Sequence, residues 1–259
     1  MKKVLLVLAF AITFSVNAQM EDNSSSTSAT GEYSVAMGSG TIASGDYSTA
    51  MGRYTTASGD YSTATGSRTK ASGYLSTALG SEADATGERS TAMGYYTIAS
   101  GNNSTAMGYS AEASGERSTA MGYNTTASGI ASIAMGYYTR ASVDYSTAMG
   151  VETTANGTVS TAMGYWTKAS DRSSLVIGEY NLTGSTVTSS ADQFSLDNTA
   201  FVIGNGVDGD NRSDALVVKF NGDATLAGNL NINSDARLKA NIISCLLYTS
   251  DAADELCSV

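Results

Sequence analysis

Small apolar and small polar residues alternate along most of the chain in a pattern that repeats every fourteen residues. Glycine recurs at this interval from Gly38 to Gly178. A second glycine series, offset by seven residues, begins at Gly31 and is interrupted at Val143 and Asp171. Each repeat thus has two halves, S-T-A-M-G and T-x-A-S-G. Because glycine costs about 1 kcal/mol per occurrence in a helix, the pattern predicts two short β-strands per repeat, turned at each glycine, and not a coiled coil.

Alternation assigns the two faces of these strands. The Ser, Thr and Ala positions, such as Ser48 and Ala50, share the inward parity with the glycines. Their small side chains are expected to fill a flat interior, with the hydroxyls bonded to backbone carbonyls. One outward column, from Ile42 to Lys168, is variable and mostly polar. The prediction is an all-β roll of 14-residue coils over residues 31–178.

The other outward column is apolar and consists mainly of methionine. Its eight methionines are Met37, Met51, Met93, Met107, Met121, Met135, Met149 and Met163. Thr65, Leu79 and Ile177 occupy the remaining places. Because contiguous apolar surface on a soluble protein marks an interaction site, this column indicates a partner surface.

Five tyrosines directly follow first-series glycines: Tyr95, Tyr109, Tyr123, Tyr137 and Tyr165. Two interpretations stay open. The column is either a stripe that faces a glycan or protein ligand, or a stack of rings that stabilises coil corners or the subunit contact. Stacking contributes about 0.5–1.5 kcal/mol per pair without any ligand, which favours the second interpretation.

A column of carboxylates lies beside the second glycine series: Asp46, Asp60, Glu88, Glu116 and Asp144. Carboxylate oxygens are calcium ligands. The column is nevertheless interrupted by Asn102, Ile130 and Thr158. Arg89 and Arg117 also directly follow two of its members, which would neutralise them. A solvated edge is the better interpretation, and we expect no metal.

Composition excludes several classes of function. The chain carries 24 acidic and 14 basic residues, and the net charge of −10 disfavours nucleic acid as a partner. It has no histidine, which removes imidazole metal ligands and Ser-His or Cys-His catalysis. We therefore expect no cofactor and no ordinary enzyme activity. Since Cys245 and Cys257 both lie near the end of the chain, the fold would have no disulfide.

The N-terminal residues have the pattern of a secretory signal peptide over residues 1–18. Lys2 and Lys3 precede an apolar run, and a small-residue cleavage site precedes Gln19. The apolar run is too short to span a bilayer comfortably, so no transmembrane segment is expected in the mature chain. Residues 19–30 are expected to form a disordered spacer.

Repeats such as STAMGYYTIASGNN and STAMGYNTTASGIA resemble the head repeats of YadA-type trimeric autotransporter adhesins across residues 31–178. The resemblance implies a left-handed parallel β-roll, packed as three copies around a threefold axis. The methionine column, which already indicates a partner surface, is then the expected trimer interface. It also implies a secreted or bacterial cell-surface location. The resulting homotrimer would bind a surface or matrix ligand that the sequence does not identify.

The repeat breaks over residues 179–233, which we interpret as a cap and a β-rich neck. Ser174–Gly178 and Ala200–Gly204 are bulkier versions of the first half-repeat. Further strands are expected at Ala215–Phe220 and Ala224–Leu226, on either side of an Asn-Gly turn. Such a cap would protect the open end of the roll.

Residues 234–242, SDARLKANI, resemble the opening of the intramolecular chaperone domain of phage endosialidase tailspikes. By that resemblance, Ser234 would be the nucleophile and Lys239 its base for self-cleavage in a full-length protein. In a purely structural interpretation, Ser234 caps a helix. Residues 234–244 would be the truncated start of that domain. Residues 245–255, CLLYTSDAADE, resemble a translated sequencing adapter, so residues 245–259 are interpreted as an artefactual tail.

The leading hypothesis is a structural and adhesive fibre head that mediates attachment to a host, a matrix or another surface. A self-processing, tail-fibre-like protein with a C-terminal chaperone is the alternative. An ice-binding solenoid is a weaker candidate: a threonine rank runs from Thr49 to Thr119, but the rank beside it is methionine.

Overall fold

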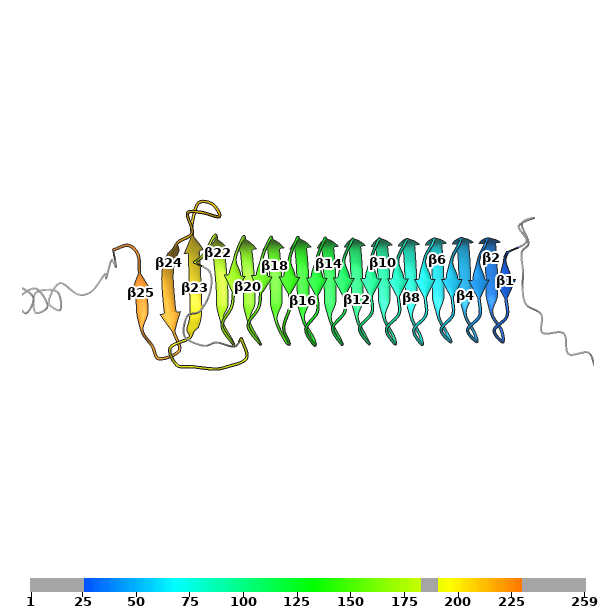
Figure 1. Ribbon diagram of the computed structural model, residues 1–259, viewed down its shortest axis with the longest axis horizontal. Coiled ribbons are helices and arrows are strands. Elements are labelled where there is room, and N and C mark those ends of the chain that lie inside the picture. Colours follow the sequence, from blue (N-terminus) through cyan, green and yellow to red (C-terminus); the bar gives the residue numbers. More distant parts are fainter. Residues whose placement is uncertain (1–25, 183–190, 230–259) are drawn as a thin grey trace, which may run out of the picture. The chain divides into compact units, whose positions relative to one another are not determined.

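Every regular element that the structure describes is a β-strand (Figure 1). The computed structural model describes residues 26–182 and 191–229. The chain forms two units, residues 1–225 and residues 226–259, and only residues 226–229 of the second are described. Within the described ranges, no helix is long and apolar enough to cross a membrane. The expected signal peptide lies outside these ranges.

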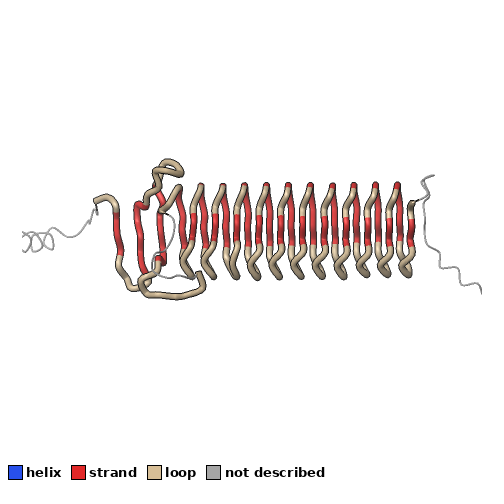
Figure 2. Tube along the Cα trace, viewed as in Figure 1, coloured by secondary structure: helices blue, strands red, loops and turns tan. Residues whose placement is uncertain are grey.

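Each coil of the first unit contributes one two-residue strand and one five-residue strand, which fall into separate sheets (Figure 2). The short-strand sheet has 11 strands: β1 (Ser28–Ala29), β3 (Ile42–Ala43), β5 (Thr56–Ala57), β7 (Lys70–Ala71), β9 (Asp84–Ala85), β11 (Ile98–Ala99), β13 (Glu112–Ala113), β15 (Thr126–Ala127), β17 (Arg140–Ala141), β19 (Thr154–Ala155) and β21 (Lys168–Ala169). The long-strand sheet begins with β2 (Val35–Ser39), β4 (Thr49–Arg53), β6 (Thr63–Ser67), β8 (Thr77–Ser81), β10 (Thr91–Tyr95), β12 (Thr105–Tyr109), β14 (Thr119–Tyr123), β16 (Ile133–Tyr137), β18 (Thr147–Val151), β20 (Thr161–Tyr165) and β22 (Leu175–Glu179).

Neighbouring coils pair in parallel and in register, so each residue lies beside its equivalent in the next coil. Met107 pairs with Met121 between β12 and β14. Ala113 pairs with Ala127 between β13 and β15. The predicted all-β roll of 14-residue coils is therefore confirmed.

The interior of the roll from Ser34 to Ala169 is filled by small side chains, as predicted. Both alanine columns are fully buried from Ala36 to Ala169, and the serine column is at most 2% exposed. The expectation for the buried hydroxyls is only partly met. Ser34 and Ser174 each donate to the carbonyl three residues earlier. The equivalent hydroxyls from Ser48 to Ser132 have no hydrogen-bond partner in the described part of the chain.

The turns do not lie at the first-series glycines, which corrects the prediction. Gly52 is the fourth residue of β4 and has a φ of 120°. A Cβ there would lie 2.0 Å from the carbonyl oxygen of Gly66 in the next coil, so only glycine fits this close approach. The chain instead turns two residues later, at a left-handed residue with an ordinary side chain such as Tyr54 (φ 54°). The predicted turns at the second-series glycines are present, as at Gly59, where the left-handed residue is Tyr61 (φ 58°).

The roll also begins earlier than the sequence suggested. Part of the expected spacer, Ser28–Ala29, forms β1 and pairs with β3. Thr27 is buried and Gly31 lies against the backbone of Gly45. Residues 27–31, TSATG, follow the second half-repeat closely enough to add one more short strand.

After β22 the long-strand sheet continues into an irregular cap formed by β23 (Thr199–Asn205), β24 (Asp214–Lys219) and their connections. β23 pairs in parallel with β22, and β24 pairs antiparallel with β23 with two register shifts. β25 (Ala224–Leu226) follows a turn at Gly222, which has a φ of 94°. The strands expected between Ala200 and Leu226 are thus present.

Candidate functional site

The methionine stripe runs along the outer face of the long-strand sheet. We use this name for the eight methionines together with Thr65, Leu79 and Ile177, which are stacked in register by the parallel pairing. All of its methionines are half-buried except Met163, which is 38% exposed. Each side chain covers its neighbours along the stack, while its remaining surface faces away from the roll.

The sequence analysis missed how far this stripe extends. Ile177 pairs with Ile203 of β23, and Ile203 pairs with Leu216 of β24. The threonine column beside the stripe becomes apolar at the same end, where Leu175 pairs with Phe201. The interruption of the repeat concealed this continuity, although the bulkier half-repeats carry the same residue type at the stripe position.

The tyrosine ladder consists of the last residue of five long strands: Tyr95, Tyr109, Tyr123, Tyr137 and Tyr165. The rings of Tyr109 and Tyr123 are stacked, with centroids 4.7 Å apart and planes 8° apart. Partial desolvation and the neighbouring rings raise the pKa of Tyr123. Stacking therefore joins the four tyrosines from Tyr95 to Tyr137, whereas Val151 separates Tyr165 from them. About two fifths of each of the five residues remains exposed.

A second aromatic stack lies at the corners of the N-terminal coils. Tyr33, Tyr47 and Tyr61 have left-handed backbones, and the rings of Tyr47 and Tyr61 are 4.9 Å apart and nearly parallel. Desolvation within the stack, followed by the influence of Tyr61, raises the pKa of Tyr47. The fourteen-residue spacing of these three tyrosines is the sequence signal that could have revealed the stack.

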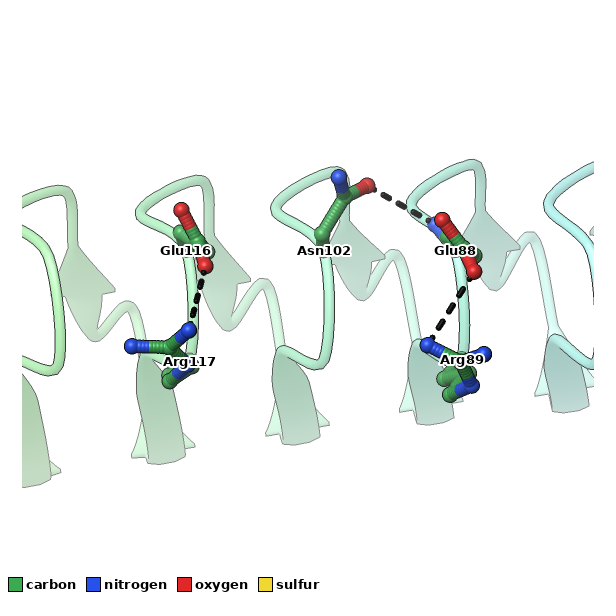
Figure 3. A network of polar contacts seen from close by, with 5 residues as sticks. All are labelled: Glu88, Arg89, Asn102, Glu116 and Arg117. Carbon is green, nitrogen blue, oxygen red and sulfur yellow. Dashed lines mark hydrogen bonds and ion pairs between the residues drawn. The ribbon is translucent and has the colours of Figure 1, made fainter.

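The carboxylate column works as a set of backbone caps and ion pairs. The Asp60 carboxylate accepts a hydrogen bond from the N–H of Asp46 in the preceding coil, at 3.0 Å. The Asp46 carboxylate does the same for the N–H of Glu32. The Asn102 amide oxygen likewise accepts a hydrogen bond from the N–H of Glu88 (Figure 3). The shorter Asp and Asn side chains thus tie neighbouring coils together.

The longer glutamates of this column bind arginine instead. Glu88 pairs with Arg89 at 3.1 Å and Glu116 pairs with Arg117 at 3.0 Å (Figure 3). No group of three or more potential His, Cys, Asp or Glu ligands gathers anywhere among the described residues. These backbone hydrogen bonds and ion pairs give the carboxylate column a structural role at the edge of the roll.

The opposite outer surface of the roll carries the variable column on the short-strand sheet. Lys70, Glu112 and Arg140 are exposed there, as expected from alternation. Burial raises the pKa of the Asp84 carboxyl, and the neighbouring Lys70 partly opposes this rise. The threonine rank from Thr49 to Thr119 lies on the other sheet, directly beside the methionine stripe, and does not form a separate flat face.

Ser234 and Lys239 lie outside the described residues, as do Cys245 and Cys257. The suggested self-cleavage therefore remains a prediction, together with the chaperone and adapter interpretations of the last 26 residues.

The comparisons with known proteins bear on the roll. The family profile of the YadA head domain repeat matches in successive copies from residue 25 to residue 179, which is more than half of the chain. A search of curated proteins gives no match. The first matched residues include β1, in agreement with the early start of the roll. The chain therefore belongs to the family of proteins built from YadA head domain repeats.

Proposed function

We propose that the chain is the head of an adhesive fibre displayed on a bacterial surface, and that it works as a homotrimer joined through the methionine stripe. The observation that carries this proposal is the methionine stripe, apolar at every position except Thr65, on the outside of a YadA-type roll whose interior is already filled. Membership of this family supports an adhesive role and an assembly of three subunits, because YadA-type heads are trimeric adhesins.

The stripe is well suited to a subunit interface. Full burial of an exposed methionine contributes about 1.5–3 kcal/mol. Since these side chains are already half-buried, a partner would add on the order of 1 kcal/mol for each of them. Summed over the stripe, this gain is comparable with the cost of bringing subunits together. A monomer would leave the same surface in water.

The rest of the surface is compatible with this assembly. Most charged groups and the corner aromatics lie on the short-strand sheet and at the coil corners, so they would stay accessible when the long-strand sheets meet. The tyrosine ladder, by contrast, ends the long strands on the same outer face as the methionine stripe. A rigid roll of eleven coils, spaced about 4.8 Å apart, would hold these groups on the order of 50 Å along one axis.

The oligomeric part is tested by the double substitution Met107→Asp and Met121→Asp. Three copies would place six carboxylates at the proposed interface, and analytical ultracentrifugation should show monomers with weakened β-structure. The control is Lys70→Asp with Lys168→Asp, on the opposite face, which should leave the trimer intact. A methionine variant that stays trimeric and equally stable would refute this interface.

The adhesive part is tested separately by displaying the full chain on a non-adherent bacterium. Cells carrying it should attach to matrix-coated plastic or to a cultured cell layer, and the methionine variant should reduce attachment. Attachment no better than that of cells without the chain would contradict an adhesive role.

A further inference from the structure

The outer face of the short-strand sheet has a recess of about 460 Å³ between Tyr96 and Tyr138. These two tyrosines occupy the same corner position, three coils apart. At this position Ser110 and Asn124 stand between them, whereas from Tyr54 to Tyr180 the other corners carry Arg, Glu or aromatic side chains. Three coil spacings of about 4.8 Å separate the two walls by roughly 14 Å. Two consecutive small corners thus open a gap in an otherwise bulky column.

Both walls of the recess are held in place by neighbours outside it. The hydroxyl of Tyr96 bonds to the Glu82 carboxylate, which raises its pKa to about 12. Its ring also lies edge-on to Tyr95, at 4.4 Å between centroids. The ring of Tyr138 lies 4.7 Å from that of Tyr137. Tyr96 and Tyr138 nevertheless remain 45% and 42% exposed, so their positions are fixed while their surfaces stay available.

Four polar side chains of the recess have no partners among the residues that the structure describes. The side chains of Ser110, Glu112, Asn124 and Arg140 line it and make no hydrogen bond or ion pair within the described part of the chain. Glutamate accepts hydrogen bonds, arginine donates them, and the serine hydroxyl and the asparagine amide do both. A ligand seated here would meet donors and acceptors close together between two aromatic walls.

We infer that this recess binds a neutral oligosaccharide, a refinement that rests on the proposed adhesive function. Sugar rings present C–H faces that pack on aromatic rings, and hydroxyls that both donate and accept hydrogen bonds. The recess offers both kinds of surface, and its volume lies within the range of about 300–1,000 Å³ that is usual for small-molecule sites.

The alternatives fit less well. A peptide bound by strand addition needs a free sheet edge, but β11, β13 and β15 are each paired on both sides. An anionic polymer needs a basic surface, and here Arg140 is balanced by Glu112. The part of the ligand that occupies this first recess is therefore expected to carry no net charge.

A second recess of about 320 Å³ continues from the first. Tyr138 and Arg140 line both, and Trp166 stands on the far side with Glu152 at the corner between the two rings. Lys168 and Arg212 also line the second recess, where the Arg212 guanidinium donates to the carbonyls of Trp166 and Asn181. The aromatic side chains Tyr96, Tyr138 and Trp166 thus follow the roll axis at intervals of three and two coils. This row suits an extended saccharide chain better than a single sugar.

The test fills the first recess. In the full chain, Ser110→Tyr with Asn124→Tyr extends the aromatic column with the residue that already occupies this corner at Tyr54 and Tyr96, so the fold should be preserved. The probes are printed neutral and acidic oligosaccharides, followed by calorimetry with any neutral one that is retained. We expect binding to the original chain and its loss in the filled variant.

Two further variants test the contribution of the recess wall and provide a control outside the recess. Tyr138→Ala removes the shared wall and should weaken binding about tenfold. Tyr54→Ala removes an aromatic corner outside the recess and should leave binding unchanged. Retention of no saccharide, retention of acidic saccharides alone, or equal binding by the filled variant would each overturn the inference. If displayed cells still attach when the filled variant is used, adhesion stands and the recess is not its site.

Discussion

The coils of the roll are paired on both sides by copies of themselves, whereas the cap closes the stack with side chains that occur once. In the roll, the N–H of Thr154 donates to the carbonyl of Thr167 in the next coil. At the last coil the equivalent bond goes to a side chain, because the N–H of Lys168 donates to the Asn181 amide oxygen at 2.7 Å. The Asn181 amide nitrogen returns a bond to the Lys168 carbonyl.

A second side chain plays a similar part. Asp171 stands where the roll has glycine, is only 2% exposed, and accepts hydrogen bonds from the N–H and the hydroxyl of Thr199. One carboxamide and one carboxylate therefore satisfy backbone and side-chain groups that another coil would otherwise cover. The roll depends on backbone fit repeated many times, and the cap depends on a few individual contacts.

The largest effect is expected from a glycine in the middle of the roll. Gly108→Ala would place a Cβ 2.2 Å from the Gly122 carbonyl oxygen, at a φ of 122°. We expect destabilisation of more than about 4 kcal/mol, measured by thermal unfolding followed with circular dichroism. Gly209→Ala in the cap meets nothing within 4 Å and should change the stability by less than about 0.5 kcal/mol. Similar effects of the two substitutions would remove the distinction between roll and cap.

A smaller effect is expected from the carboxamide that closes the roll. Asn181→Ala leaves the Lys168 N–H and carbonyl without their partners and should cost about 2 kcal/mol. Hydrogen exchange should be faster at the Lys168 amide but unchanged at Met107. Asn156→Ala, whose side chain makes no hydrogen bond in the described structure, is the matched control. If hydrogen exchange at the Lys168 backbone amide is unaffected, the Asn181 side chain does not supply the hydrogen bonds that a further coil would make.

One corner of the roll offers a gain in stability. Val159 is β-branched, 48% exposed and held at a φ of 61°, a conformation that asparagine adopts more readily. Val159→Asn should therefore raise the free energy of unfolding by about 0.5–1 kcal/mol. Val151→Asn, at the end of β18 with an ordinary backbone, should bring no such gain. Equal melting temperatures for both variants would show that the corner is unstrained.

The smallest effects are local and concern two tyrosines with a pKa of about 12, Tyr96 within the roll and Tyr180 next to the cap. The main causes are the hydrogen bonds that the Tyr96 hydroxyl donates to Glu82 and the Tyr180 hydroxyl donates to Tyr165. Carbon-13 NMR of the tyrosine rings should show that Glu82→Ala lowers only the pKa of Tyr96. Tyr165→Phe should lower only the pKa of Tyr180.

The direction of the pH effect follows from these raised values. Each hydrogen bond favours the protonated phenol, so its contribution to stability is complete below the ordinary pKa of about 10. The contribution is lost as the pH rises through about 12. A tyrosine pKa that does not move in either variant would indicate that the contact is absent in solution.

Features that recur in every coil could be predicted from the sequence, because alternation and period together place a residue on a face. The buried alanine columns and the outward positions of Met107 and Lys70 are examples. The turns at the second-series glycines were predicted correctly, as at Gly59, whose carbonyl accepts a hydrogen bond from the N–H of Ser62 across the turn. The turns that follow the first-series glycines could not be predicted in this way. A left-handed backbone at Tyr54 or Arg68 leaves no mark in residue type, and the glycines two residues earlier serve the close approach of coils.

Contacts that occur only once in the molecule could not be predicted from the repeat. Asp171 appeared only as an interruption of a glycine series, and its contact with Thr199 joins residues 28 positions apart. The recess between Tyr96 and Tyr138 was also missed, because it is defined by the two small corners between them and not by any motif. Both depend on which residues depart from the pattern.

The interchangeable coils have a consequence for inheritance. Unequal recombination between neighbouring repeats of the gene would insert or delete whole coils, and each would change the reach of the head by about 4.8 Å. The contacts of Asn181 and Asp171 involve only the last coils, so they would survive such a change. Between Tyr96 and Tyr138, however, an added coil would alter the spacing of the walls. The length of the head can thus change through the number of repeats in the gene alone. Selection on the recess, however, would keep the three coil spacings between Tyr96 and Tyr138 unchanged.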